Sequence, residues 1–265
     1  MGKIVTLLTD FGLKDTYVGQ MKGVISGVCE DANIIDLTHD IEAQNIHSAG
    51  YLLVDAMGVF NDTSVHIAVV DPGVGSKRKE IAVKTEKGIL IGPDNGLFTA
   101  AIKRYGFEGA VELNKSKYWY GHSNTFHGRD IFASIAGHLL NGVKMEAMGD
   151  KLDNIETIQL LEPKIEDEGI EGHVVLIDHF GNLLCDITED DLHQSIGKLD
   201  DKVAVVCGGE MIRGIKRTFS DVWVGEAIVY IGSSMRLEIA VREGSAAKRF
   251  EVGLGDRITV KRNTL

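Results

Sequence analysis

The spacing of the apolar residues changes near residue 161 of this chain. Before that point, short apolar runs alternate with segments in which apolar residues recur every three or four positions. The runs are typical of buried strands and the periodic segments of amphipathic helices. We expect strands at residues 4–8, 33–37, 65–70, 81–84, 89–91 and 110–113, and helices at residues 15–29, 46–60 and 130–141. This alternation predicts an α/β sheet with helices on both of its faces.

After residue 161 the apolar runs follow one another closely, with no long helical segment between them. They are HVVLID, NLLCDI, KVAVVC, AIVYIG, RLEIAVR and RITVKR, separated by turn signals such as HFGN, CGGE and GLGD. This spacing is typical of a smaller antiparallel, all-β, barrel-like domain. An acidic segment lies between the two patterns. We therefore expect an α/β N-terminal domain at 1–161, a linker at 162–171 and a β C-terminal domain at 172–265.

Charge and cysteine content exclude several classes of protein. The net charge of -11 argues against a general affinity for nucleic acid or for anionic membranes. No apolar stretch reaches the roughly 18 residues that a membrane span needs. Cys29, Cys185 and Cys207 are odd in number and widely spaced, which is typical of reduced thiols. We expect a cytoplasmic protein with no nucleic-acid or membrane partner.

Three side chains that suit the activation of a water molecule stand in two loops. Asp71 follows an apolar run in VVDPGVGSKR, and Arg78 closes the same motif. His127 stands in NTFHGRD, just before a predicted helix. A carboxylate, a guanidinium and an imidazole can together orient water and accept its proton. The structural alternatives are that Asp71 caps the Pro-Gly turn that follows it and that His127 is a capping or packed residue.

Two further motifs carry groups that suit a nucleoside. LTDFGLKD places Asp10 and Asp15 after the first predicted strand, where a carboxylate commonly binds ribose hydroxyls. Asp15 could equally be a helix N-cap. IDHFGN places Asp178, Phe180 and Asn182 on one turn, which offers a charge, an aromatic face and an amide edge. That turn could equally be an ordinary hairpin loop.

A metal site is the less favoured alternative for the second loop. It would combine His122, His127 and Asp130. The spacing is not HExxH, and no second pair of histidines supports it. We therefore expect neither a metal nor a cofactor.

Seven motifs occur in the order in which they occur in the S-adenosylmethionine hydroxide adenosyltransferases, a family related to fluorinase and chlorinase. They are LTDFG, THDI, VVDPGVGSKR, GPDNGLF, TFHGRDIFA, DHFGN and SSMRLEIAVREGSAA, and they extend over nearly the whole chain. The resemblance implies hydrolysis of S-adenosylmethionine at the ribose C5′, with adenosine and methionine as products. It also implies a homotrimer whose sites lie between the N-terminal domain of one subunit and the C-terminal domain of the next.

The resemblance also implies roles for individual residues. The catalytic Asp-Arg-His set of the family corresponds to Asp71, Arg78 and His127. In this scheme Arg78 holds a water, and either His127 or Asp71 accepts its proton. The substrate-binding residues are expected to be Asp10, Asp15, Phe126, Asp178, Phe180, Asn182, Phe219, Ser233, Glu238 and the Val241 backbone, with Asp10 on the ribose and Phe219 stacked on adenine. The sequence leaves open which sulfonium epimer is the substrate.

Two other functions compete with hydrolysis. Fluorinase-like sequences carry Tyr-Pro and Tyr-Ser where this chain has Asp71-Pro72 and His127-Gly128. Asp71 would repel a halide by about 4 kcal/mol at ~4 Å under an effective dielectric near 20, which disfavours a halogenase. A sensor that binds S-adenosylmethionine or adenosine without turnover would not need the three polar side chains together. The residues therefore favour hydrolysis.

Overall fold

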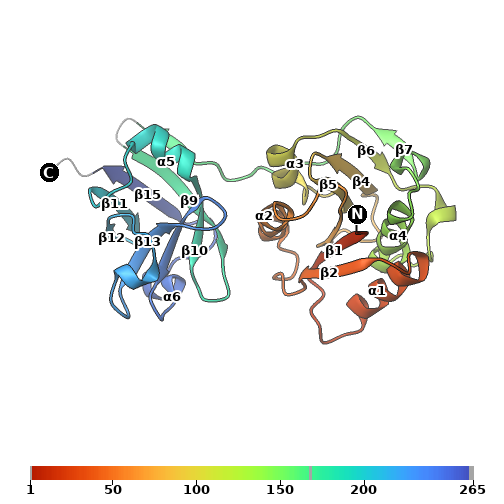
Figure 1. The fold of residues 1–265 in the computed structure, drawn as a ribbon, viewed down its shortest axis with the longest axis horizontal. Helices are drawn as coiled ribbons and strands as arrows, with labels where there is room; N and C mark the ends of the chain where they lie inside the picture. The colour runs from red at the N-terminus through yellow and green to blue at the C-terminus, as the bar shows by residue number, and fades with distance from the viewer. Residues whose placement is uncertain (1, 167–168, 263–265) are drawn as a thin grey trace. The chain divides into compact units, whose positions relative to one another are not determined.

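A computed structural model describes residues 2–166 and 169–262 of the chain. It divides into two compact units, Met1–Leu160 and Leu161–Leu265, each with a sheet of its own (Figure 1). None of the helices in these two described ranges is long and apolar enough to cross a membrane.

Part of the segment that we expected as a linker is a strand of the second unit. Within it, β8 (Lys164–Glu166) pairs with β9 (Gly169–Ile177) in an antiparallel ladder. Residues 167 and 168 of the expected linker lie outside the described residues. Backbone pairing, which an acidic composition does not reveal, therefore extends the sheet into this segment.

The first unit is built around a seven-stranded mixed sheet in the order β2-β1-β3-β5-β4-β6-β7. The strands β2, β1, β3 and β5 pair in parallel, whereas β4, β6 and β7 join antiparallel. The bounds are β1 (Ile4–Thr9), β2 (Asn33–Thr38), β3 (Val65–Val69), β4 (Glu80–Thr85), β5 (Gly88–Pro93), β6 (Gly109–Glu112) and β7 (Asp150–Leu152). Because β1 and β3 are parallel neighbours, the loops after them leave the same edge of the sheet. Those loops carry Asp10 and Asp71.

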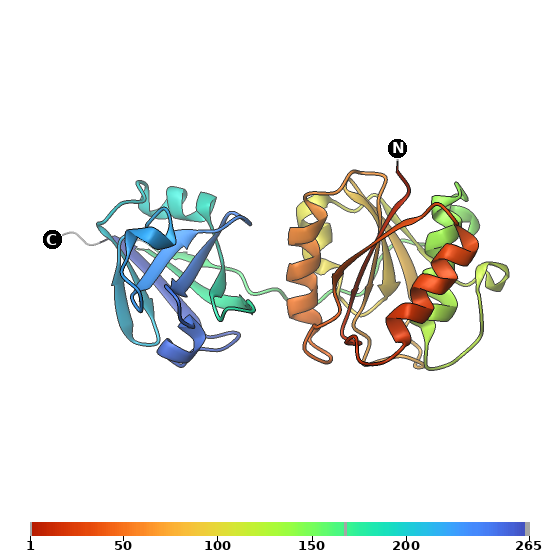
Figure 2. The same cartoon turned by 60° about the horizontal axis from the view of Figure 1, so that its bottom comes forward.

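Helices cover both faces of this sheet, as Figure 2 shows. One face packs against α1 (Tyr17–Val28), the π-helix η2 (Gly128–Ala133) and α4 (Ser134–Leu140). The other packs against α2 (Ile46–Met57) and α3 (Thr99–Tyr105). Alternation along β1 supplies both cores, since Leu7 faces the first set of helices and Leu8 the second. The short helices η1 (Ser116–Tyr118) and η3 (Met145–Ala147) complete the unit. The predicted α/β architecture is confirmed.

The second unit is an antiparallel eight-stranded sheet in the order β12-β11-β15-β9-β10-β14-β13, with β8 beside β9. Its remaining strands are β10 (Leu183–Thr188), β11 (Val203–Cys207), β12 (Glu210–Arg213), β13 (Ala227–Ile231), β14 (Arg236–Val241) and β15 (Arg257–Arg262). A bridge between Ile215 and Val229 joins the chain after β12 to β13 and so nearly closes the sheet. The predicted barrel-like, all-β domain is confirmed.

Three short helices accompany the barrel: α5 (Glu189–Ile196), η4 (Phe219–Asp221) and α6 (Ala246–Phe250). We did not predict α5, although its start carries a sequence signal. The Thr188 hydroxyl accepts the backbone N–H of Asp191, and the Asp191 carboxylate accepts the Thr188 N–H, which makes a capping box.

Candidate active site

Asp71 lies just beyond the end of β3, and its carboxylate is bound by Arg78. Both oxygens take part: Arg78 Nε donates to Oδ1 over 3.0 Å and Nη2 donates to Oδ2. The intervening loop turns back at Gly75, whose φ of +77° favours glycine and where a Cβ would meet the Asn124 carbonyl at 2.6 Å. Asp71 is thus one half of a bidentate ion pair, rather than only the cap of its own turn.

Each guanidinium N–H group of Arg78 has a hydrogen-bond partner. Beyond its two bonds to Asp71, Nη1 donates to Glu80 Oε1 over 2.7 Å and to the Lys79 carbonyl over 3.3 Å. The second Nη2 hydrogen is directed at His127 Nδ1, 2.9 Å away. A guanidinium has five N–H donors, and each has a partner here. The Arg78 group also lies over the buried Phe132 ring, at 5.9 Å from its centroid. In this arrangement Arg78 holds the side chains around it, and the role in holding a water stays a prediction.

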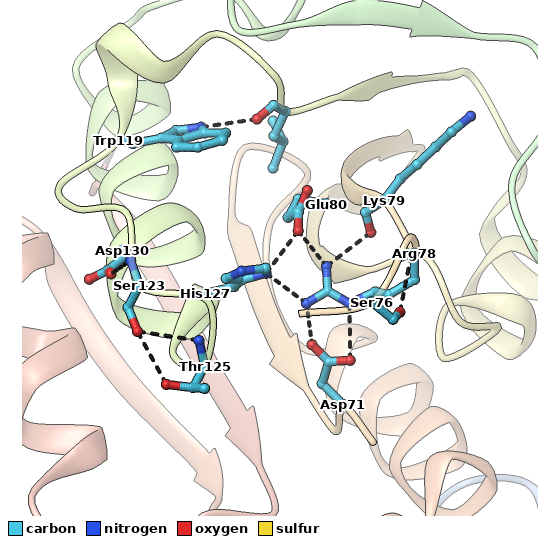
Figure 3. Close-up of polar contacts among 11 residues, drawn as sticks. Asp71, Ser76, Arg78, Lys79, Glu80, Trp119, Ser123, Thr125, His127 and Asp130 are labelled. Carbon is cyan, nitrogen blue, oxygen red and sulfur yellow. Dashed lines mark hydrogen bonds and ion pairs between the residues drawn. The ribbon is translucent and has the colours of Figure 1, made fainter. Parts of the chain in front are cut away.

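Glu80 is a member of this cluster that our sequence analysis missed. Its Oε1 lies 2.8 Å from His127 Nδ1 as well as 2.7 Å from Arg78 Nη1 (Figure 3). The exposed fractions of the Asp71, Arg78 and Glu80 side chains are only 6%, 9% and 18%. The signal was the spacing, because Arg78 stands two positions before Glu80, the first residue of β4, and side chains two positions apart in an extended chain point to the same side.

His127 is placed by an unusual helix start. The helix that we expected from residue 130 begins at Gly128, with η2 as its first turns, and His127 is the residue before it. π-helical turns are rare and are frequent at functional sites. Asp130 secures the preceding loop by accepting from Arg129 Nε and from the Ser123 backbone N–H. Burial raises the pKa of the Asp130 carboxyl, but these two bonds outweigh it and leave that pKa below its usual value.

Asp130 is therefore occupied by other protein groups. This bears on the metal alternative that combines it with His122 and His127. Among residues 2–166 and 169–262, no group of three or more His, Cys, Asp and Glu side chains is placed to hold a metal ion.

A cavity of about 210 Å³ adjoins the cluster, and Asp71, His127, Asp10 and Phe126 line it. The Asp10 carboxylate accepts the backbone N–H of Gln44, another lining residue, over 3.0 Å. Gln44 holds a left-handed backbone with φ of 69° to make this bond. The loops after β1 and β3 and the start of η2 thus bring four of our predicted residues to one cavity.

A second cavity, of about 380 Å³, shares part of its lining with the first. The two share Phe11, Thr125 and Phe126, and Tyr17, Gln20 and Arg129 lie on the walls of the second. The rings of Phe11, Tyr17 and Phe126 pack edge to face, with centroids 5.2 to 6.0 Å apart. The two adjoining cavities, which aromatic and polar side chains line, are together called the hollow of the first unit.

Asp15 stands apart from this hollow. Its side chain is exposed, and it lines neither cavity. It is not the N-cap of α1 either, because that position is Thr16. The structure thus rules out the N-cap role, and substrate binding by Asp15 stays a prediction.

In the second unit, Asp178, Phe180 and Asn182 share the turn between β9 and β10. Asp178 Oδ1 accepts the backbone N–H groups of the other two, and Oδ2 accepts the Asn182 amide. The carboxylate thus builds the turn, and the turn leaves the Phe180 ring 73% exposed. Asp178 thus has the structural role that we gave as the alternative, that of an ordinary hairpin loop. The same turn presents the Phe180 ring to solvent.

A second group in this unit centres on Tyr230, which our sequence analysis also missed. The Tyr230 hydroxyl donates to the buried Glu238 over 2.5 Å, and the Phe219 ring packs on the Tyr230 ring at 5.2 Å. Burial, the Glu238 carboxylate and the nearby Asp178 carboxylate all raise the pKa of the Tyr230 phenol. Ser233 is exposed, and Val241 ends β14 with its carbonyl bonded to the Gly244 N–H.

Comparison with known proteins places this arrangement in a family. The model of the SAM hydroxide adenosyltransferase N-terminal domain matches residues 5–149, and that of the C-terminal domain matches residues 172–259. An "(R)-S-adenosyl-L-methionine hydrolase" of Thermus thermophilus is 35% identical, with 97% of this chain and 98% of that protein covered. One from Salinispora tropica is 34% identical, with 97% of each covered.

More distant relatives and a solved structure extend the comparison. A "Fluorinase" of Actinopolyspora mzabensis is 26% identical, with 98% of this chain and 97% of that protein covered. The crystal structure of an uncharacterized conserved protein from Thermotoga maritima is similar, with a TM-score of 0.93 at 38% identity. It covers 97% of this chain, and all of that chain is covered.

Proposed function

This chain belongs to the SAM hydroxide adenosyltransferase family, and we propose that it hydrolyses S-adenosyl-L-methionine to adenosine and L-methionine. The observation that carries the proposal is the convergence of Asp71, Arg78 and His127 beside a cavity. Relatives that are named as hydrolases of this sulfonium compound support the same reaction.

The chemistry needs a stronger nucleophile, not a better leaving group. When water oxygen bonds to the ribose C5′, the C5′–S electron pair leaves with sulfur and methionine departs as a neutral thioether. No general acid is therefore required, whereas the water must lose a proton to a base. Asp71 and His127 line the cavity and are the available acceptors. Arg78 has all its donors engaged, so its role is to hold these two side chains in place for in-line attack.

The charge of the cluster favours a sulfonium over a halide. We first attributed the repulsion of a halide to the Asp71 carboxylate, but Arg78 balances that charge. Glu80 brings a second carboxylate to the same guanidinium. With a neutral His127 the cluster keeps one net negative charge. At ~4 Å and an effective dielectric of about 20, that charge is worth about 4 kcal/mol of attraction to a cation or of repulsion to a halide. Hydrolysis is favoured over halogenation on this ground.

The finer parts of the proposal concern the epimer, the assembly and the compartment. We take the substrate to be the (R) sulfonium epimer, because that is the substrate in the names of the relatives. We propose a homotrimer in which a neighbouring subunit contributes Phe180 and Phe219, both solvent-exposed in this chain. We place the enzyme in the cytoplasm, since all three cysteines are buried free thiols.

Turnover in oxygen-18 water tests the reaction directly. We expect mass spectrometry to find the label in the 5′-hydroxyl of the adenosine product, from the (R) epimer in preference to the (S). Asp71→Ala and His127→Ala should each lower kcat by about 100-fold or more, since a positioned base typically contributes that much. Glu108→Gln removes a carboxylate from an exposed pair with Lys84 and should leave kcat unchanged. Unlabelled adenosine, or none, would refute the proposal.

A further inference from the structure

The turn that follows β5 is bonded to both chain segments that carry the proposed catalytic cluster. It consists of Asp94 and Asn95, from the motif GPDNGLF, to which we had assigned no role. The Asn95 side-chain amide donates to the Val70 carbonyl over 2.9 Å. The Asp94 backbone N–H donates to the Lys79 carbonyl, also over 2.9 Å. The turn thus connects the chain just after β3 with the chain just before β4.

Each of these two carbonyl groups stands next to a residue of the cluster. The Val70 carbonyl belongs to the peptide bond that leads into Asp71. The Lys79 carbonyl belongs to the peptide bond that leads into Glu80, and it also accepts from Arg78 Nη1 over 3.3 Å. The ion pair of Asp71 and Arg78 joins the two segments through side chains. The turn joins the same segments through their main chains, so it fixes the places from which the two partners extend.

The Asn95 amide has only one orientation that satisfies its neighbours. Its Oδ1 accepts the Leu97 backbone N–H over 3.2 Å, and the carbonyl opposite Nδ2 can only accept. Gly96, between these two residues, has a φ of +89°, which favours glycine. On the other side of the turn, Asp94 Oδ1 accepts the Glu156 backbone N–H over 2.7 Å. The turn is therefore held from both sides, and its one free side-chain donor group is directed at the end of β3.

We propose that Asn95 is a positioning residue that fixes the main chain before Asp71 and thereby aims the Asp71 carboxylate at the cavity. The inference rests on the proposed hydrolysis. Asn95 lines neither cavity, so it acts on the reaction through Asp71 rather than through the substrate. Val70 is fully buried, so its carbonyl stays unsatisfied without this donor unless the chain moves. A misplacement of about 1 Å can lower a rate about 100-fold, so loss of the Asn95 bond should lower kcat and leave substrate binding nearly unchanged.

Asn95→Ser separates the bond to Val70 from the turn itself. A serine hydroxyl can still accept the Leu97 N–H, as in other turns of this kind, but it is too short to reach the Val70 carbonyl as well. The matched control is Tyr105→Phe, which removes a 3.1 Å bond from a side-chain donor to the Val54 carbonyl in the same unit. Both variants should lower the melting midpoint of the first unit by about 2–8 °C, because each leaves one carbonyl without its donor.

Kinetics distinguish a positioning role from a merely structural one. We expect kcat to fall about 10- to 100-fold in Asn95→Ser, with KM within about 3-fold of wild type. In Tyr105→Phe, kcat should stay within about 2-fold of wild type, because neither Tyr105 nor Val54 lines a cavity. A kcat for Asn95→Ser within about 2-fold of wild type, or an equal loss of kcat in the control, would overturn the inference.

A second measurement does not need turnover. Arg78 Nε donates to Asp71 Oδ1 in a nearly buried pair, so the Nε–H should exchange slowly with water in nitrogen-15 NMR spectra. The signal is assigned by its loss in Arg78→Lys. We expect exchange about 10-fold faster in Asn95→Ser and unchanged in Tyr105→Phe, and equally slow exchange in Asn95→Ser would contradict the inference. If the wild type releases no adenosine, the proposed function fails, and the exchange rate alone decides whether Asn95 holds the pair.

Discussion

Replacement of Arg78 by methionine should destabilise the first unit strongly. The change removes the one guanidinium between two carboxylates, and the three side chains are only 6% to 18% exposed. Removing one partner of a buried ion pair costs about 3–5 kcal/mol, because a buried charge is left uncompensated. The loss of stability has an upper limit, because a carboxylate left without its partner can take up a proton instead. Protonating an ordinary carboxyl at pH 7 costs about 4 kcal/mol. We therefore expect a loss of about 3–5 kcal/mol.

The assay is calorimetry of the full chain at pH 7. For a unit of this size, 1 kcal/mol corresponds to about 2–4 °C, so the transition of the first unit should fall by about 6–20 °C. A variant that also carries Asp71→Asn and Glu80→Gln has no uncompensated charge and should recover more than half of the loss while remaining inactive. Arg104→Met, at an exposed position on α3, is the control and should lose under about 1 kcal/mol. An Arg78→Met protein that melts within about 2 °C of wild type would refute the reasoning, as would a triple variant that recovers nothing.

Two further predictions concern residues outside the ion pair. Burial lowers the pKa of His66 to about 4, so below the ordinary value near 6.5 the unfolded chain binds more protons than the folded one. Stability should therefore fall as the pH drops from 6.5 to 4, by up to about 3 kcal/mol, and His66→Gln should flatten this slope in thermal melts; parallel slopes would contradict the assignment. Gln44→Gly removes the side chain from a left-handed backbone and should raise stability by about 1 kcal/mol. The backbone N–H of residue 44, and not its side chain, binds Asp10, so Gln44→Gly should keep its activity. Gln44→Ala keeps a Cβ on the left-handed backbone and should gain no stability.

Sequence periodicity located most elements of the fold closely. The strand expected at 33–37 is β2 (Asn33–Thr38), and the helix expected at 15–29 is α1 (Tyr17–Val28). The three catalytic candidates were also identified by their residue types. The order of strands was not: β4 lies antiparallel between β5 and β6, a placement that depends on pairing between distant segments. The short strand β8, inside the expected linker, was missed for the same reason.

The sequence by itself determined the change from an α/β to an all-β pattern and the faces of the helices and strands, and it marked Asp71, Arg78 and His127 as catalytic candidates. These are local properties, because they depend on side-chain types and on spacings of two to four residues. Only the tertiary structure brought Arg78 within 2.9 Å of a histidine 49 positions away and placed Glu80 against both. The tertiary structure also decides which groups accept from the Arg78 N–H donors. It directs the Asp178 carboxylate toward the backbone N–H groups of its own turn. Hydrogen bonds require atoms to lie within about 3 Å, and the folding of the whole chain decides which atoms do.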